Sequence, residues 1–336
     1  MKKLFALLLT LAVALCAFGC VEPDDSSDVT KAEYTMVMPD GAPVLAAINL
    51  IKNYPEIDGH KMNYRVVPAS NIGQEFVKND IAILPTNAAA KLYNQGIDLK
   101  LASVNVFGTM YMIGEKEFTS FEELKGKVVY SIGQGNTPEL LMKYFLNLAG
   151  VEYLTSDTPV EGKVAFRYVN EGPEVIQAML KYRSGVSNKQ ADYGVIGQPA
   201  AKNALAKISG TKIVLDFQSE WKKTNEADYA QAGVVVKGNV AGDASFIAAL
   251  RNALAENYEF ITENPDAITE VLTANDSSLK SMTFDKALID SCNIGYRSAA
   301  DVKAELEAYF VKATDYDEAA KVFYGNKLPD DKFYLK

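Results

Sequence analysis

The stretch VVYSIGQGNTPELLMKYFLNL, residues 128–148, decides the fold class. Its first five residues are β-branched or aromatic apart from one serine, which predicts a buried strand over 128–132. The Gly- and Pro-rich run 133–138 interrupts that strand, and a helix is expected over 139–148. A buried strand, a tight loop and a helix in direct succession are typical of an α/β sheet.

The same alternation extends in both directions from this stretch. Before it, Ser120 can cap a short helix that ends at Gly126. Alternating strands and helices of this kind predict a mainly parallel sheet covered by helices. Strands are expected over 34–38, 62–67, 81–84, 100–106, 111–114, 164–169, 191–196, 212–215 and 231–237. Helices are expected over 43–51, 72–78, 88–94, 173–182, 200–207, 244–263, 265–273, 284–292, 299–313 and 317–323.

The amino-acid composition excludes several classes of function for this protein. The chain has 336 residues, 34 Lys+Arg, 43 Asp+Glu, one His and three Cys. Its length corresponds to roughly two domains of about 150 residues each. The net charge of −9 argues against a nucleic-acid partner, which would need a basic surface. A single His and scattered Cys exclude multi-histidine metal sites, zinc fingers and iron–sulfur clusters, so we expect no metal and no cofactor.

The N-terminus predicts export. Lys2 and Lys3 precede an apolar run that is too short to span a bilayer, as in a signal peptide covering residues 1–19. The run ends at Cys20, and its last residues resemble a bacterial lipobox, although Ala17 stands where Leu is usual. The alternatives are lipidation of Cys20, giving a lipoprotein anchored to the membrane, and plain secretion. Residues 20–32 are polar and acidic and are interpreted as a flexible tether.

Catalytic and nucleotide-binding motifs are missing from the chain. The loop 133–138 lacks the third glycine of a dinucleotide fingerprint, and no Walker sequence or nucleophile elbow occurs. His60 lacks obvious partners, and Cys292 is interpreted as a small buried apolar residue. We therefore expect a protein that is not an enzyme.

Several strands end in loops of Gly, Pro and polar residues just before a helix begins. Such loops follow the expected strands at residues 39–43, 85–87, 107–109, 133–138 and 197–199. In open α/β sheets, ligands bind outside the carboxyl ends of the strands, where helix N–H groups are exposed. Asp40 is the acidic side chain of these loops, and it can either cap a helix or hold a ligand amine or hydroxyl. The loops together predict a ligand site.

Three motifs resemble those of a known family. They are PDGAP at 39–43, FEELKGKVV at 121–129 and DYGVIGQP at 192–199. With the export signal, they look like the solute-binding proteins of ABC transporters. The nearest group is the one serving alkanesulfonates, taurine, nitrate-type anions and thiamine-pyrimidine precursors. The resemblance covers most of residues 33–325, and its motifs indicate the class of protein and not the ligand.

The resemblance implies a type II periplasmic-binding-protein fold, in which two α/β lobes are joined by two crossovers and close on a solute. Lobe one would cover 33–113 and 235–336, and lobe two 114–234. The implied partners are a small solute and an ABC permease, for a monomeric chain located outside the cytoplasm. The implied ligand-binding residues are Asp40, Gly41, Ala42, Thr86, Asn87, Gly108, Thr109, Gln134, Gly135, Asn136, Thr137 and Gln198.

These loops contain neither Arg nor Lys, unlike sites that clamp a carboxylate with Arg. A neutral, zwitterionic or aromatic solute therefore suits the side chains better than a strong anion. Tyr111, Tyr193 and Trp221 are candidates for stacking on such a solute, although a role in the core is the alternative for each.

Two other functions stay open. An enzyme on the same clamp fold, similar to those that act on menaquinone precursors, is the main alternative to a transport receptor. An extracellular sensor or adhesion module is the third. The export signal and the lack of a base or nucleophile favour the receptor.

Overall fold

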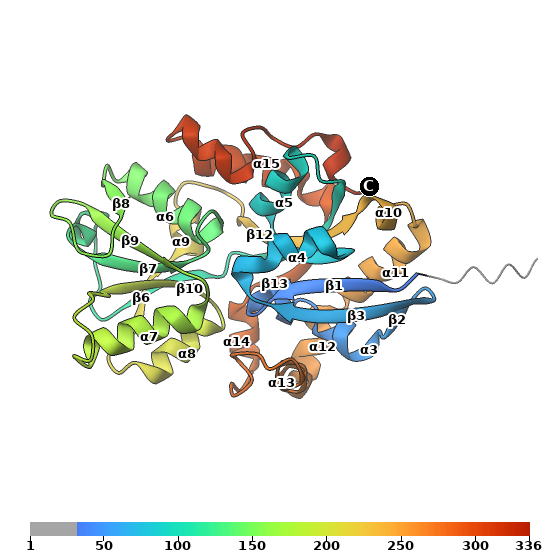
Figure 1. Ribbon diagram of the computed structural model, residues 1–336, viewed down its shortest axis with the longest axis horizontal. Coiled ribbons are helices and arrows are strands. Elements are labelled where there is room, and N and C mark those ends of the chain that lie inside the picture. Colours follow the sequence, from blue (N-terminus) through green and yellow to red (C-terminus); the bar gives the residue numbers. More distant parts are fainter. Residues whose placement is uncertain (1–31) are drawn as a thin grey trace, which may run out of the picture. The chain divides into compact units, whose positions relative to one another are not determined.

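Two β-sheets, each with helices against it, form the described part of the chain, which is residues 32–336 of a computed structural model (Figure 1). The expected signal peptide, Cys20 and nearly all of the tether lie outside the described residues. The first sheet has seven strands in the order β13-β5-β12-β4-β1-β3-β2. Their bounds are β1 Tyr34–Pro39, β2 Glu56–Ile57, β3 His60–Val67, β4 Ile81–Pro85, β5 Leu99–Phe107, β12 Ala230–Lys237 and β13 Ile294–Ser298.

The second sheet has six strands in the order β11-β6-β10-β7-β9-β8. Their bounds are β6 Met110–Gly114, β7 Val128–Ile132, β8 Tyr153–Thr155, β9 Val164–Val169, β10 Tyr193–Gly197 and β11 Lys212–Asp216. We call the first sheet with its helices lobe one, and the second sheet with its helices lobe two.

The sheets are mixed rather than mainly parallel. Strands β1, β3 and β4 run parallel, as do β7, β8, β9 and β10. The pairs β12–β4, β12–β5, β13–β5, β6–β10 and β6–β11 are antiparallel. Helices lie in most of the connections between parallel strands, although a loop without a helix joins β8 to β9. Strands β6 and β12 are the strands that follow each passage between the lobes.

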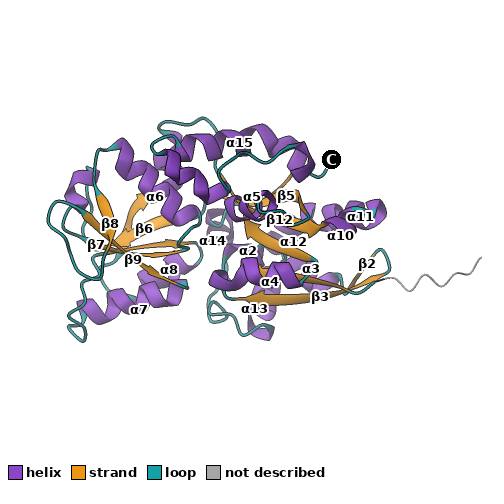
Figure 2. Cartoon of the chain, turned by 45° about the horizontal axis from the view of Figure 1, so that its top comes forward, coloured by secondary structure: helices purple, strands orange, loops and turns teal. Residues whose placement is uncertain are grey.

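Helices pack against both sheets (Figure 2). Those that come before β6 or after β11 are α2 Ala42–Leu45, α3 Ile48–Asn53, α4 Ile72–Lys78, α5 Thr86–Asn94, α9 Phe217–Lys222, α10 Gly238–Ala241, α11 Ala244–Ala255, α12 Asn257–Glu263, α13 Pro265–Ala274, α14 Lys286–Ser291 and α15 Ala299–Thr314. Those between β7 and β11 are α6 Thr137–Leu148, α7 Gly172–Arg183 and α8 Ala200–Lys207. The short helix expected before Gly126 is a 3₁₀ helix, Phe121–Leu124, whose capping box joins Ser120 and Glu123.

Several expected elements differ in the structure. The helix expected over 43–51 is broken into α2 and α3, and the one expected over 244–263 into α11 and α12. The last expected helix is a 3₁₀ helix, Glu318–Tyr324. Strands β2, β8 and β13 were not expected; the first two are very short, and β13 is defined by its pairing with β5 rather than by a strong local pattern.

The chain passes between the lobes after β5 and again before β12. The strand expected over 111–114 was placed in lobe one, but Met110–Gly114 pairs with β10 and β11 in the second sheet. The reason is the short loop Gly108–Thr109, which takes the chain out of the first sheet before β6 begins. No helix within residues 32–336 combines the length and apolar composition that crossing a bilayer requires.

Candidate functional site

A cavity of about 520 Å³ lies where strands from both sheets end. Its wall includes the last residues of β1 and β4 from lobe one and of β7, β9 and β10 from lobe two. Carboxyl ends of parallel strands are where open α/β sheets place ligands, because the following loops and helix starts expose polar groups there. The cavity is therefore the candidate site.

Eight of the twelve expected ligand-binding residues line this cavity. They are Asp40, Gly41, Ala42, Thr109, Gln134, Asn136, Thr137 and Gln198. The expected residues on the two sides of the cavity differ in burial. Thr109 is buried, and its N–H donates to Gln231 Oε1 at 2.9 Å, whereas Gln134 is exposed at the tip of its loop. Whether these residues bind a solute stays a prediction.

The other four expected residues, Thr86, Asn87, Gly108 and Gly135, lie outside the lining. The side chains of Thr86 and Asn87 form hydrogen bonds with backbone carbonyls instead. The Thr86 hydroxyl donates to the Ala230 carbonyl at 2.6 Å. The Asn87 amide donates to the carbonyls of Gly135 at 3.1 Å and Phe323 at 3.0 Å, so it joins α5 to the loop before α6. Both side chains belong to the first turn of α5, which turns them toward neighbouring backbone and away from the cavity.

Gly108 belongs to the crossover between the lobes, because it lies between β5 and β6. Its N–H donates to the Tyr229 carbonyl at 3.2 Å, and its φ is +30°. A Cβ at this position would lie 2.7 Å from Gln218 Cγ, so the close approach of the two connecting segments requires glycine. Gln218 Oε1 also accepts hydrogen bonds from Met110 N–H at 3.0 Å and from the Tyr229 hydroxyl. These contacts tie the two connections to each other.

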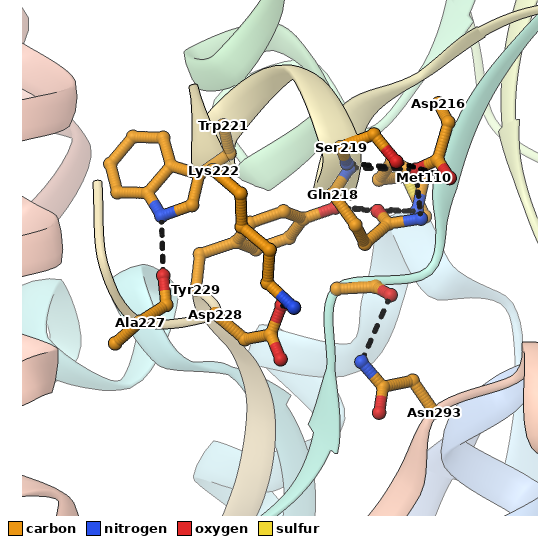
Figure 3. Close-up of polar contacts among 11 residues, drawn as sticks. Met110, Asp216, Gln218, Ser219, Trp221, Lys222, Ala227, Asp228, Tyr229 and Asn293 are labelled. Carbon is orange, nitrogen blue, oxygen red and sulfur yellow. Dashed lines mark hydrogen bonds and ion pairs between the residues drawn. The ribbon is translucent and has the colours of Figure 1, made fainter. Parts of the chain in front are cut away.

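Tyr111, Tyr193 and Trp221, the candidates for stacking whose alternative was a role in the core, are not part of the lining. Tyr193 packs against Phe118, with ring centroids 5.9 Å apart. Trp221 is buried, and its indole N–H donates to the Ala227 carbonyl at 2.9 Å (Figure 3). The aromatic ring that does line the cavity is Tyr168, at the end of β9. Burial and the neighbouring Glu139 carboxylate raise the pKa of Tyr168, so its hydroxyl keeps its proton and can donate.

On the lobe-one side, Asp40 does not cap a helix. Helix α2 has Gly41 as its N-cap and receives no side-chain hydrogen bond. Instead the Asp40 carboxylate accepts from Ser277 Oγ at 2.6 Å, Ser278 N–H at 2.9 Å and Ser278 Oγ at 2.8 Å. It also accepts from Gly41 N–H at 3.0 Å. Four neutral donors therefore hold this charge in place.

On the lobe-two side, Glu171 and Glu174 line the cavity, and sequence reasoning missed both. The Glu174 carboxylate accepts from Asn170 N–H at 2.7 Å. No described residue gives the Glu171 carboxylate a hydrogen bond or an ion pair. Burial, with the charges of Asp40 and Glu174, raises the pKa of Glu171. The available signal was the loop 170–171, which follows β9 and precedes a helix with Pro173 in its first turn, as in the other loops.

Two long helices begin at the cavity, and each carries a carboxylate in its first turn. In α6 this is the buried Glu139, which accepts from Gly135 N–H at 2.7 Å and pairs with Lys143 at 2.6 Å. In α7 it is Glu174. Among the described residues that line the cavity, none is Lys, Arg or His. The site therefore offers carboxylates, amides and hydroxyls, with no cationic side chain.

His60 and Cys292 lie outside the cavity lining. His60 does have a partner, since its Nε2 is 3.1 Å from Asp243 Oδ2. Asp58, His60 and Asp243 form a group whose possible ligand atoms lie within 4.8 Å of one another. Cys292 is fully buried in the core, as expected, and burial raises the pKa of its thiol to about 12. A thiol with such a pKa stays protonated and unreactive at neutral pH.

No protein-family model matches the chain, and neither does any curated protein. Solved structures do. An ABC transporter protein from Parabacteroides distasonis is 25% identical with a TM-score of 0.71, over 90% of this chain and 99% of that one. The ligand-binding component of an ABC-type import system from Staphylococcus aureus, solved with zinc bound, is 12% identical with a TM-score of 0.60, over 90% and 98%. The periplasmic aliphatic sulphonate-binding protein SsuA from Escherichia coli is 15% identical with a TM-score of 0.57, over 83% and 92%.

These likenesses span nearly the whole of each related chain and both lobes of this one. They confirm the fold class expected from the sequence, and they include proteins of the group that its motifs resemble. The chain has the periplasmic-binding-protein fold, and its structural neighbours are binding proteins of ABC transporters, among them sulfonate-binding proteins.

Proposed function

We propose that this chain is the extracytoplasmic solute-binding receptor of an ABC importer. It would capture a small polar or aromatic solute by closure of its two lobes and present it to a membrane permease. The observation that carries the proposal is the cavity, whose polar side chains come from two separate sheets between which the chain passes twice. Lipidation of Cys20 and a monomeric state belong to the same proposal.

The geometry also favours binding over chemistry. Glu171 is the lining acid with a raised pKa, and within residues 32–336 no side chain forms a hydrogen bond with its carboxylate that would mark a catalytic pair. The thiol of Cys292 is buried in the core, away from the cavity. The structural neighbours are transport-associated binding proteins as well.

Isothermal titration of the purified chain against sulfonates, pyrimidines, amines and amino acids tests the proposal. We expect one solute class to bind with one molecule per chain and to be recovered chemically unchanged. Asn136→Ala should weaken that binding by about 1 kcal/mol, because Asn136 lines the cavity and precedes α6. Asn188→Ala, at an exposed loop position, is the matched control and should change nothing. Conversion of the solute during the titration would overturn the receptor function.

A further inference from the structure

We infer that the solute of this cavity carries a positive charge, such as an ammonium, guanidinium or amidinium group, held between Asp40 of lobe one and Glu171 of lobe two. The inference rests on the proposed function and names its substrate class. It differs from what the names of the sulfonate-binding neighbours would suggest for this chain.

The charge of the lining is the first argument. Asp40, Glu171 and Glu174 are the ionisable acids of the wall, and no described lining residue is basic. Amides and hydroxyls make up most of the remaining polar surface, and they accept as readily as they donate. A sulfonate placed here would meet like charges without a cation to balance them, whereas a cation would meet its counter-charge.

The arrangement of two of these carboxylates is the second argument. Asp40 and Glu171 come from different lobes, follow β1 and β9 respectively, and line the same cavity. They lie close enough for the Asp40 charge to raise the pKa of Glu171. Bringing the lobes together around an empty or anion-filled cavity therefore costs free energy. A cation between the two carboxylates removes that cost and favours closure, so the charge of the solute and the closing of the lobes are coupled.

The starts of α6 and α7 are the third argument. Helix N-termini are common sites for anions because their first N–H groups have no partner within the helix. Here the chain supplies its own anions, since Glu139 takes the Gly135 N–H before α6 and Glu174 takes the Asn170 N–H before α7. Both N–H groups lie just before the helices, and the two carboxylates add negative charge in the first helical turns, which opposes the binding of an anion at either helix start.

The wall also limits the size and character of the cation. The cavity of about 520 Å³ has apolar side chains of Ile72, Ile132, Ile196 and Leu279 in its lining, beside the ring of Tyr168. Such walls suit the hydrocarbon or ring portion of an organic cation. A bare metal ion would leave this apolar surface uncovered.

Calorimetric titration with two matched pairs of probes, in buffer containing EDTA, tests the inference. Benzamidine and benzenesulfonate share a ring, and butylamine and butanesulfonate share a chain, so each pair differs only in its charged head group. We expect the cation of each pair to bind at least tenfold more tightly than its anion. Glu171→Gln should weaken cation binding at least fivefold, and Glu161→Gln, which changes an exposed acid, should not.

The outcomes separate this inference from the proposed function. Tighter binding of a sulfonate, abolished by Asn136→Ala, overturns the cationic substrate class and leaves the receptor function standing. Cation binding that Glu171→Gln leaves unchanged also overturns the inference, because the charge would then be held elsewhere. Absence of binding by all four probes counts against both.

Discussion

The two sides of the cavity hold their carboxylates in opposite ways. On the lobe-one side, Asp40 accepts hydrogen bonds from Ser277, Ser278 and Gly41, so its charge is stabilised within the protein. On the lobe-two side, Glu171 is half-buried, and no described residue gives it a hydrogen bond. The difference indicates that Asp40 stabilises the fold of its lobe as well as the cavity wall, whereas Glu171 is left for a solute.

The largest expected effect follows from Asp40→Ala. The change leaves the donors of Ser277, Ser278 and Gly41 without their acceptor, and it should lower the free energy of unfolding by about 2–3 kcal/mol. Urea denaturation measures the change. Glu226→Ala removes an exposed acid and serves as the control. If the Asp40 variant were as stable as wild type, Asp40 would not stabilise the fold of lobe one.

A smaller effect is expected from Ser277→Ala. The buried Ser277 hydroxyl donates to Asp40 and accepts from the Leu279 N–H at 3.0 Å, so its loss should cost about 1–1.5 kcal/mol. Ser278→Ala should cost less, because Ser278 is exposed and water can replace its hydroxyl. Denaturation of the two serine variants side by side checks the order. A reversed order would show that burial does not decide the strength of these contacts.

Glu171→Gln should act in the other direction. An ionised carboxylate that is partly removed from water and faces Asp40 destabilises the solute-free chain. We expect the amide variant to be more stable at pH 7 by about 1 kcal/mol or less, since water screens a group that is only partly buried. Solute-free samples and denaturation in parallel with wild type measure the gain. Destabilisation by this change would mean that Glu171 has a structural partner, as Asp40 does.

The smallest effect is the pH dependence of that difference. Because the pKa of Glu171 is raised in the folded chain, the destabilisation is fully present above the folded pKa and disappears below the ordinary value of 4.5. The stability gain of Glu171→Gln should therefore shrink as the pH falls from 7 to 4. Acids that do not face Glu171 contribute equally to both proteins and cancel in the comparison. If the stability gain of Glu171→Gln grew as the pH fell, the pKa of Glu171 would be lowered in the folded chain and not raised.

Much of the fold could be predicted from local patterns. The strand at 128–132 and the helices at 72–78 and 200–207 match the structure in their bounds, because each combines a strong local pattern with clear Gly, Pro or polar boundaries. Strand β13 could not be predicted, since its pairing with β5 depends on residues almost two hundred positions away. The lobe assignment of Met110–Gly114 failed for the same reason.

The sequence also predicted that the loops after the strands surround a ligand site, and most of the residues chosen from these loops line the cavity. The errors concern side-chain direction. Thr86 and Asn87 stand at the start of a helix, as a ligand contact would, yet their side chains bond to the backbone of Ala230 and Phe323. The sequence does not show which group of the folded chain will be the hydrogen-bond partner of such a side chain.

The sequence by itself determined the class of architecture and the set of loops that surround the site, because strand and helix patterns and turn residues are local properties of the chain. Tertiary structure alone decided which carboxylates face the cavity and which of them already have partners. The roles of Asp40 and Glu171 depend on Ser277 and Ser278, far along the chain, and on which helix starts face the same space. A carboxylate is a satisfied structural group or an unpaired ligand contact according to the donors around it, and those donors come together only in the folded chain.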